Sequence, residues 1–203
     1  MDGNGYPVKF FVAYKERQGR LSTFFRLVLA VPWLVWLYVW GIAFTIVVVM
    51  AWFVLLFTAQ WPAELFNFAV RYMRFQARVG AWLFMLTDKF PAWGGKPDPQ
   101  FGVTFEVDAQ QCYSRPKTFF RLVLVLPLSA LMYGVQFYSL IFLFLAWWAI
   151  LFTGRLPHWC YQPLADSMAW NQRVQGYSNL LVEKWPPFAG NTPLPGVPTE
   201  VAA

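Results

Sequence analysis

Thr23-Phe-Phe-Arg-Leu-Val-Leu29 recurs, residue for residue, as Thr118-Phe-Phe-Arg-Leu-Val-Leu124, which lies 95 positions further along the chain. The same offset relates Leu56-Phe-Thr58 to Leu151-Phe-Thr153, and no gap is needed between the two matches. Self-similarity at one fixed offset indicates that a chain is built from two copies of one structural unit. The repeat therefore predicts the architecture before any secondary structure is assigned.

The boundaries of the two copies follow from the extent of the match. We assign the first copy to residues 7–95 and the second copy to residues 102–190. Residues 191–203 contain three prolines and few large apolar side chains, so we expect a disordered tail there. The chain is thus two membrane repeats followed by a short tail.

Each copy contains a long stretch without charge. No Asp, Glu, Lys or Arg occurs between Arg26 and Glu64, or between Arg121 and Arg155. Runs of more than about 18 apolar residues are typical of segments embedded in a bilayer. The composition agrees, because 58% of the residues are hydrophobic and 13% are charged, against roughly 25% charged in a typical soluble domain. We therefore expect an all-α integral membrane protein.

The length of each run predicts how often it crosses the membrane. As one helix, residues 27–63 would be about 55 Å long, whereas the hydrocarbon core is about 30 Å thick. We therefore expect two helical hairpins, with four membrane helices in all, and turns near Trp40-Gly41 and at residues 133–136. The alternative is an interfacial helix that ends near Pro32 or Pro127, followed by one long tilted span.

The basic residues favour the hairpins. All of them lie outside the two apolar runs, in one group before the first run, one between the runs and one after the second. Hairpins place all three groups on the cytoplasmic side, as the positive-inside rule requires. Single spans would place the strongly basic middle group outside. The pattern thus predicts a multi-pass protein with both termini in the cytoplasm.

Further segments flank the apolar runs. Every second residue is apolar within residues 8–12, and apolar and polar side chains alternate within residues 103–107. This predicts two half-buried strands that pair into a small cytoplasmic β-ribbon. Each copy then closes with an amphipathic helix, at residues 63–87 in the first copy and from Pro163 to about residue 182 in the second. We expect the first helix to lie at the membrane interface. The second helix is less basic, so it either lies there too or faces protein.

Arginines supply the candidate binding residues. Arg26 and Arg121 are repeat counterparts at the point where an apolar helix meets the headgroups. A guanidinium group can bind a phosphate through two hydrogen bonds, so these residues are candidates for binding anionic lipid. The alternative is that both side chains only extend to the interface and fix the topology.

The first closing helix is the more basic one. Arg71, Arg74 and Arg78 are spaced so that they share one helical face, opposite aromatic side chains. Arg173 is the counterpart of Arg78 in the second copy. We include these four among the candidate headgroup-binding residues. Other matched residues are expected to be structural: Pro32, Pro127, Thr58, Thr153, Pro62, Pro157, Lys89 and Lys184.

The sequence contains few residues or motifs that are typical of an enzyme. His158 is the only histidine, and the two cysteines, Cys112 and Cys160, are not repeat counterparts. No phosphate-binding loop, dinucleotide fingerprint or nucleophile motif occurs. We therefore expect no catalytic residues, no metal, no cofactor and no nucleic-acid partner.

Several ordered motifs also occur in a known family. Phe-Phe-Arg-Leu is followed by Ala-Trp, by Leu-Phe-Thr with a proline four residues later, and by Leu-Leu-x-Glu-Lys in the second copy. This set resembles an uncharacterised bacterial membrane family, domain of unknown function 4389, over nearly all of residues 7–190. Residues 151–157 keep the family's pattern, whereas residues 59–61 depart from it. The resemblance implies the bacterial inner membrane and implies no activity.

Two functions remain as hypotheses. The first is a non-catalytic scaffold or accessory subunit of a membrane assembly, since the apolar surface is broad and no catalytic set is found. Its partners would be a larger protein complex or further copies of the chain. The second is a protein that binds or moves anionic lipid, with Arg26 and Arg121 as its binding residues.

Overall fold

A computed structural model describes residues 5–98, 101–193 and 199. The described chain is mainly helical, and its two halves have the same order of elements apart from one short extra helix. The elements are β1 (Val8–Val12), α1 (Arg20–Phe24), α2 (Arg26–Thr58), α3 (Ala63–Leu83), β2 (Val103–Val107), α4 (Arg115–Thr153) and α5 (His158–Ser178).

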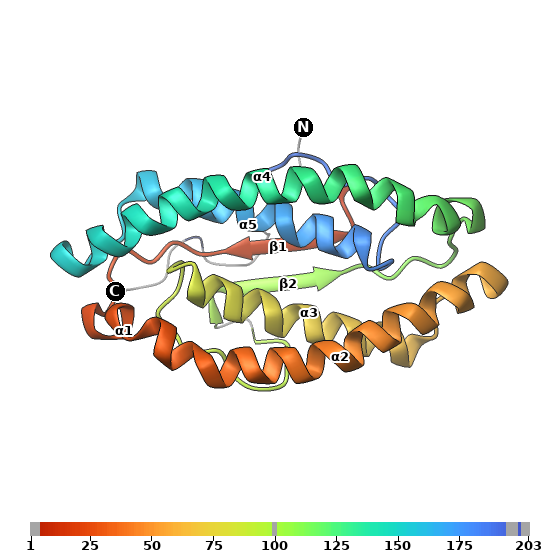
Figure 1. Ribbon diagram of the computed structural model, residues 1–203, viewed down its shortest axis with the longest axis horizontal. Helices are drawn as coiled ribbons and strands as arrows, with labels where there is room; N and C mark the ends of the chain where they lie inside the picture. The colour runs from red at the N-terminus through yellow and green to blue at the C-terminus, as the bar shows by residue number, and fades with distance from the viewer. Residues whose placement is uncertain (1–4, 99–100, 194–198, 200–203) are drawn as a thin grey trace.

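The elements form three layers. The long helices α2 and α4 run antiparallel along the length of the molecule (Figure 1) and form the outer layer. Helix α3 packs on α2, and α5 packs on α4, which makes a middle layer. The strand β1 packs against α5 and β2 against α3, so the small sheet forms the third layer. The long helices therefore have one face against protein and the rest uncovered.

The two strands pair as the alternating pattern predicts. They are antiparallel, and the register places Val8 opposite Val107 and Phe10 opposite Phe105. Since Phe105 is also the repeat counterpart of Phe10, the two copies are related by an approximate twofold axis through the centre of this pair. The predicted duplication is confirmed, and each copy contributes one strand to the shared sheet.

The prediction of four membrane helices is wrong. Helix α2 is continuous through Trp40 and Gly41, and α4 is continuous through residues 133–136. Gly41 serves a close approach instead of a turn, because a Cβ there would lie 3.0 Å from the hydroxyl of Tyr72 on α3. The alternative break near Pro32 or Pro127 is also absent, since both prolines lie inside their helices.

The closing helices start at the same repeat position. Helix α3 begins at Ala63, as predicted, but ends at Leu83. Helix α5 begins at His158 and continues through Pro163, so the predicted start after this proline is wrong. Pro62 and Pro157 precede the two helices in extended conformations, and this shared cap position decides both starts.

The tail begins with an ordered contact. The side-chain amide of Asn191 donates to the carbonyl of Val12 (2.8 Å) and to the hydroxyl of Tyr161 (3.0 Å). The predicted disordered tail, residues 191–203, otherwise falls largely outside the described residues. Asn191 therefore belongs to the folded part of the second copy.

The two copies also close each other's long helices. Ala59 ends α2 and Gly154 ends α4, both with left-handed backbone angles. The carbonyl of Ala59 accepts from the backbone N–H of Tyr113 (2.8 Å), and that of Gly154 accepts from Gln18 (3.1 Å). Each copy thus satisfies a helix end in the other.

Candidate functional site

Helices α2 and α4 carry many exposed apolar side chains, which form a broad apolar face. Two segments, Arg26–Thr58 and Val123–Thr153, are long and apolar enough to cross a bilayer, yet only 22% and 17% of their most apolar windows are buried. A core helix of a soluble protein would be mostly buried. A signal sequence near the N-terminus would not explain α4. The exposure therefore favours a lipid environment for both helices.

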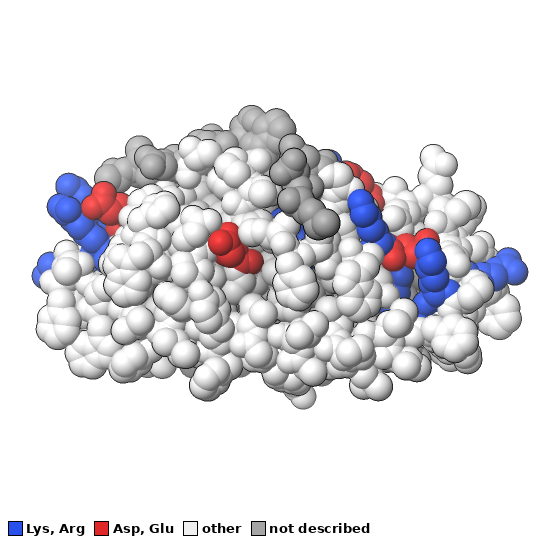
Figure 2. Space-filling model, turned by 90° about the horizontal axis from the view of Figure 1, so that it is seen from above, with Lys and Arg blue, Asp and Glu red and all other residues white. Residues whose placement is uncertain are grey.

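Charged residues lie away from this face. Figure 2 shows them near the two ends of the molecule and toward its upper edge, above a broad uncharged surface. Glu16 and Arg155 form an ion pair at one end (3.3 Å). On the sheet, Lys9 pairs with Asp108 (2.9 Å), and their side chains are 42% and 60% exposed. One side of the molecule is thus apolar, and the sheet side carries charge.

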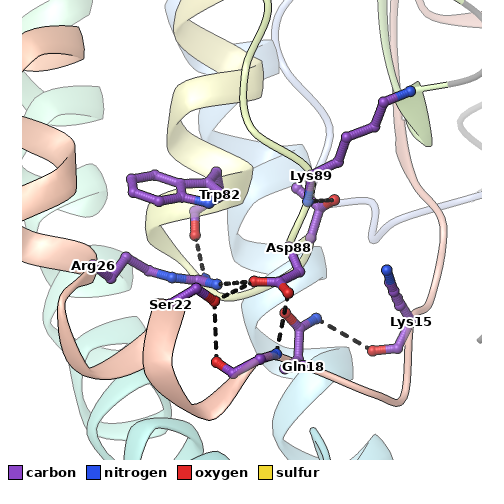
Figure 3. Close-up of polar contacts among 9 residues, drawn as sticks. Lys15, Gln18, Ser22, Arg26, Trp82, Asp88 and Lys89 are labelled. Carbon is purple, nitrogen blue, oxygen red and sulfur yellow. Dashed lines mark hydrogen bonds and ion pairs between the residues drawn. The ribbon is translucent and has the colours of Figure 1, made fainter.

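Arg26 lies inside the protein and not at its surface (Figure 3). Its side chain is 2% exposed, donates to the carbonyl of Trp82 (2.6 Å) and forms an ion pair with Asp88 (3.0 Å). Asp88 also accepts from the hydroxyl of Ser22 (2.6 Å) and from the backbone N–H of Gly19 (3.1 Å). Arg26 therefore joins the start of α2 to the end of α3, where free carbonyl groups favour a cation.

Arg121 repeats the carbonyl contacts of Arg26 in the second copy, while the Glu183 carboxylate pairs with Lys117 (3.9 Å). Arg121 is 2% exposed, donates to the carbonyls of Tyr177 (3.0 Å) and Val182 (2.9 Å), and its guanidinium lies 4.4 Å from the Tyr177 ring centre. Glu183, the counterpart of Asp88, accepts from the backbone N–H of Ser114 (2.9 Å). Both repeated arginines are thus engaged by acceptors of the protein itself.

The basic face of α3 is largely turned inward. Arg71 is exposed, but Arg74 donates to the carbonyls of Phe105 (3.0 Å) and Gly95 (3.1 Å). Arg78 is 2% exposed and lies over the ring of Phe101. Burial lowers the pKa of Arg74 and that of Arg78. Only Arg71 of these three therefore presents its charge to the surroundings.

Arg173 holds the segment after α5. It donates to the carbonyls of Ala189 and Gly190, and burial lowers its pKa. It is the counterpart of Arg78, and both side chains are 2% exposed. The second closing helix is accordingly enclosed between α4 and β1.

The other matched residues have local contacts. The hydroxyls of Thr58 and Thr153 each donate to the carbonyl four residues earlier in their helix (2.8 and 2.6 Å). Lys89 is exposed, with its ammonium 5.5 Å from the ring centre of Phe101. Lys184 donates to a backbone carbonyl before β1 (3.3 Å). These contacts order helix ends and loops.

Within the described residues, no group of three or more His, Cys, Asp or Glu side chains could hold a metal ion. Cys112 is exposed and Cys160 is buried, and both are free thiols. Burial raises the pKa of Cys160 to about 11. A raised pKa disfavours the thiolate form, so Cys160 is not a candidate nucleophile.

A small polar cavity was missed from the sequence. It has a volume of about 130 Å³ and lies between α3, α4 and α5, with Gln76, Gln136, Asn171 and Gln175 in its wall. Gln136 was interpreted as part of a turn. An amide inside an apolar helix was the available signal, since such a group needs polar partners within the protein.

Comparison with protein families gives one match. The profile described as "Domain of unknown function (DUF4389)" matches residues 20–93 and 115–190. The chain belongs to the DUF4389 family. The two DUF4389 segments coincide with the two repeats, although they leave out β1 and β2, so the match is narrower than the resemblance seen across residues 7–190. No curated protein and no solved structure matched the chain.

Proposed function

We propose that this DUF4389 protein is a non-catalytic scaffold or accessory subunit of a bacterial inner-membrane assembly. The observation that carries the proposal is the layered distribution of polarity. The outer layer, α2 and α4, exposes apolar side chains along its whole length, and the sheet layer carries charged groups. No catalytic motif is present in the sequence to suggest a reaction.

The layers support a membrane orientation different from the predicted multi-pass one. Helix α2 has 33 residues and is about 50 Å long, which exceeds the roughly 30 Å hydrocarbon core. An upright molecule would bring the exposed Lys9 and Asp108 pair into or near the hydrocarbon, at a high cost. With α2 and α4 in the bilayer plane, the apolar face meets lipid and the sheet meets water. In this orientation the sheet faces the cytoplasm.

The size of the apolar face supports a scaffold. Apolar side chains extend from Leu27 (79% exposed) to Phe57 (76% exposed) on α2, and from Phe119 (57%) to Phe152 (72%) on α4. The exposed surfaces of α2 and α4 can contact further membrane helices. Helices pack in lipid through close fit of their side chains, so a large apolar surface suits such contacts. A membrane-embedded partner would cover part of this face.

Purification from native membranes tests the scaffold. The tagged protein would be extracted with its surrounding lipid into polymer nanodiscs and analysed by quantitative mass spectrometry. We expect one membrane protein in a fixed molar ratio, retained after a high-salt wash and absent from a preparation of an unrelated protein with the same tag. A protein recovered alone, with native mass spectrometry showing only its own chain, would refute the scaffold.

Binding of anionic lipid is the second candidate, and exposed basic residues favour it. Arg20 begins α1 and Arg155 follows the end of α4, whereas Arg115 and Lys117 lie in the first turn of α4; these helix ends are at opposite ends of the molecule (Figure 1). In the in-plane orientation these groups reach the headgroups, where each basic residue contributes about 1 kcal/mol. This assignment replaces Arg26 and Arg121, whose guanidinium groups are engaged within the protein.

Vesicle binding tests this second candidate. We expect tighter association with phosphatidylglycerol vesicles than with phosphatidylcholine vesicles, and loss of this preference in Arg20→Gln combined with Arg115→Gln. Lys89→Gln, which removes an exposed charge elsewhere, is the control. An unchanged preference in the double variant would eliminate these residues as headgroup contacts.

A further inference from the structure

The cavity between α3, α4 and α5 has a polar wall, whereas the exposed surface of α2 and α4 is apolar. Its volume of about 130 Å³ would hold roughly four water molecules at about 30 Å³ each. Side-chain amides and hydroxyls make up most of its polar wall, and no charged residue lines it within the described part of the chain. The polar wall residues are Gln76, Gln136, Ser139, Ser167, Asn171, Gln172 and Gln175.

The cavity exists because the two copies differ at this place. In the second copy Ser139 and Ser167 line it. Their counterparts in the first copy are Phe44 and Tyr72, whose rings stack with centroids 4.3 Å apart. Trp40, the counterpart of Val135, packs edge-on against Tyr72. Aromatic rings therefore fill the position that small side chains leave open in the second copy.

One wall group lacks a partner. Gln172 is 4% exposed, and its carbonyl oxygen has no hydrogen-bond partner among the described residues. The neighbouring amides are already linked, because Asn171 donates to Gln136 (3.4 Å) and accepts from Gln175 (3.1 Å). A buried acceptor without a partner is destabilising, and this oxygen is closed off from groups in the cavity, so ligand contacts come from the other amides and hydroxyls of the wall.

The wall chemistry specifies the ligand. An uncharged wall gives no compensation for a phosphate or a carboxylate, whose burial without a counter-charge is very unfavourable. A hydroxyl group can donate to an amide oxygen of the wall and accept from an amide N–H or a hydroxyl beside it. The volume suits a group about the size of glycerol.

The cavity also lies beside the apolar face. Tyr133 and Leu140 lie within about one turn of Gln136 on α4, and they are 77% and 50% exposed. A hydroxyl-bearing group attached to acyl chains could therefore enter from the lipid side. We propose that this cavity binds the uncharged, hydroxyl-bearing headgroup of a lipid. The proposal uses the membrane placement given above but is independent of any protein partner.

The test measures thermal stabilisation of the purified full chain in a detergent that has no hydroxyl groups. Three probes are compared: dioctanoylglycerol, free glycerol and dioctanoyl phosphatidylglycerol. Dioctanoylglycerol should raise Tm with a saturable concentration dependence, as expected for a ligand of the folded state. The phosphate-bearing probe should bind more weakly. Equal stabilisation by free glycerol at the same concentration would assign the cavity to a free polyol and would refute the lipid source.

Ser167→Tyr places in the second copy the side chain that fills this position in the first, and should abolish the saturable shift. Gln162→Leu removes an amide of the same helix that lies outside the cavity, and should leave the shift intact. If Ser167→Tyr does not fold, Gln136→Leu at a half-buried position replaces it and should weaken binding about tenfold. Equal dioctanoylglycerol shifts in wild type and the folded cavity variant would overturn the proposal, whether or not a protein partner is found.

Discussion

Phe10 and Phe105 lie directly opposite each other in the antiparallel sheet and occupy the same position in the two copies. Each is 1% exposed, because the faces of β1 and β2 that carry them pack against α5 and α3. The approximate twofold axis passes between the two rings. The centre of the molecule is therefore shared equally by the two copies.

This pair yields a prediction about stability. Phe10→Ala and Phe105→Ala should each lower the free energy of unfolding by about 3–5 kcal/mol, since each leaves a cavity in the same layer. The two effects should be similar because the environments are related by the axis. Denaturant unfolding of both variants in detergent measures this. A near-neutral effect for one of them would mean that the two strands are not equivalent.

Removal of Arg26 separates a structural role from a headgroup role. Arg26→Met leaves Asp88 without its cation and the Trp82 carbonyl without its donor. We expect a loss of about 2–4 kcal/mol, below the largest values for buried pairs because the Asp88 side chain is 24% exposed. The loss should be the same with and without anionic lipid. Destabilisation that occurs only in anionic lipid would instead support the headgroup role.

The two cysteines should differ in reactivity. Cys112 is exposed and should react with a maleimide at neutral pH, whereas Cys160 is 0% exposed and its pKa is raised to about 11 by burial. The unfolded thiol has the ordinary value of 9.0. Stability from protonated Cys160 is thus present below about pH 9 and is lost as the pH rises towards 11. Intact mass measurement should show one adduct in the native protein and two after denaturation; two adducts at neutral pH in the native state would contradict this burial.

The in-plane orientation predicts the sidedness of labelling. In a Cys112→Ser background, Arg20→Cys and Gln60→Cys place single exposed thiols at opposite ends of the molecule (Figure 1). A membrane-impermeant maleimide should reach both from the same side of sealed vesicles. Tyr133→Cys, within the apolar face, should stay unlabelled and is the control. Labelling of the two ends from opposite sides would show that α2 and α4 cross the bilayer.

Local patterns predicted part of this fold well. The strands follow from alternation within residues 8–12 and 103–107, and their equivalence follows from the fixed offset, so both were available from the sequence. The number of long helices could not be predicted from these patterns. The run lengths indicate hairpins only for helices perpendicular to the membrane, and Gly41 marks a close contact with Tyr72 on another helix instead of a turn.

The candidate site depended on contacts that no local pattern reveals. Arg26 was placed at the headgroups because an apolar run follows it, yet its partners Trp82 and Asp88 come from the other end of the copy. The polar cavity needs the two copies compared in space, since Ser167 matters only where Tyr72 would otherwise fill the volume. Aligning the two copies at the repeat offset shows which positions differ. It does not show which of these positions lie close together in the folded protein.

The helix ends at Ala59 and Gly154 carry a consequence for how such a chain arose. Each end is closed by a backbone N–H from the other copy, Tyr113 in one case and Gln18 in the other. A single-copy ancestor could make these bonds, and the shared sheet, only by pairing with an identical molecule. Joining two genes in tandem would have made that pairing independent of concentration, and it would also have freed each half to change separately, as the cavity of the second half requires.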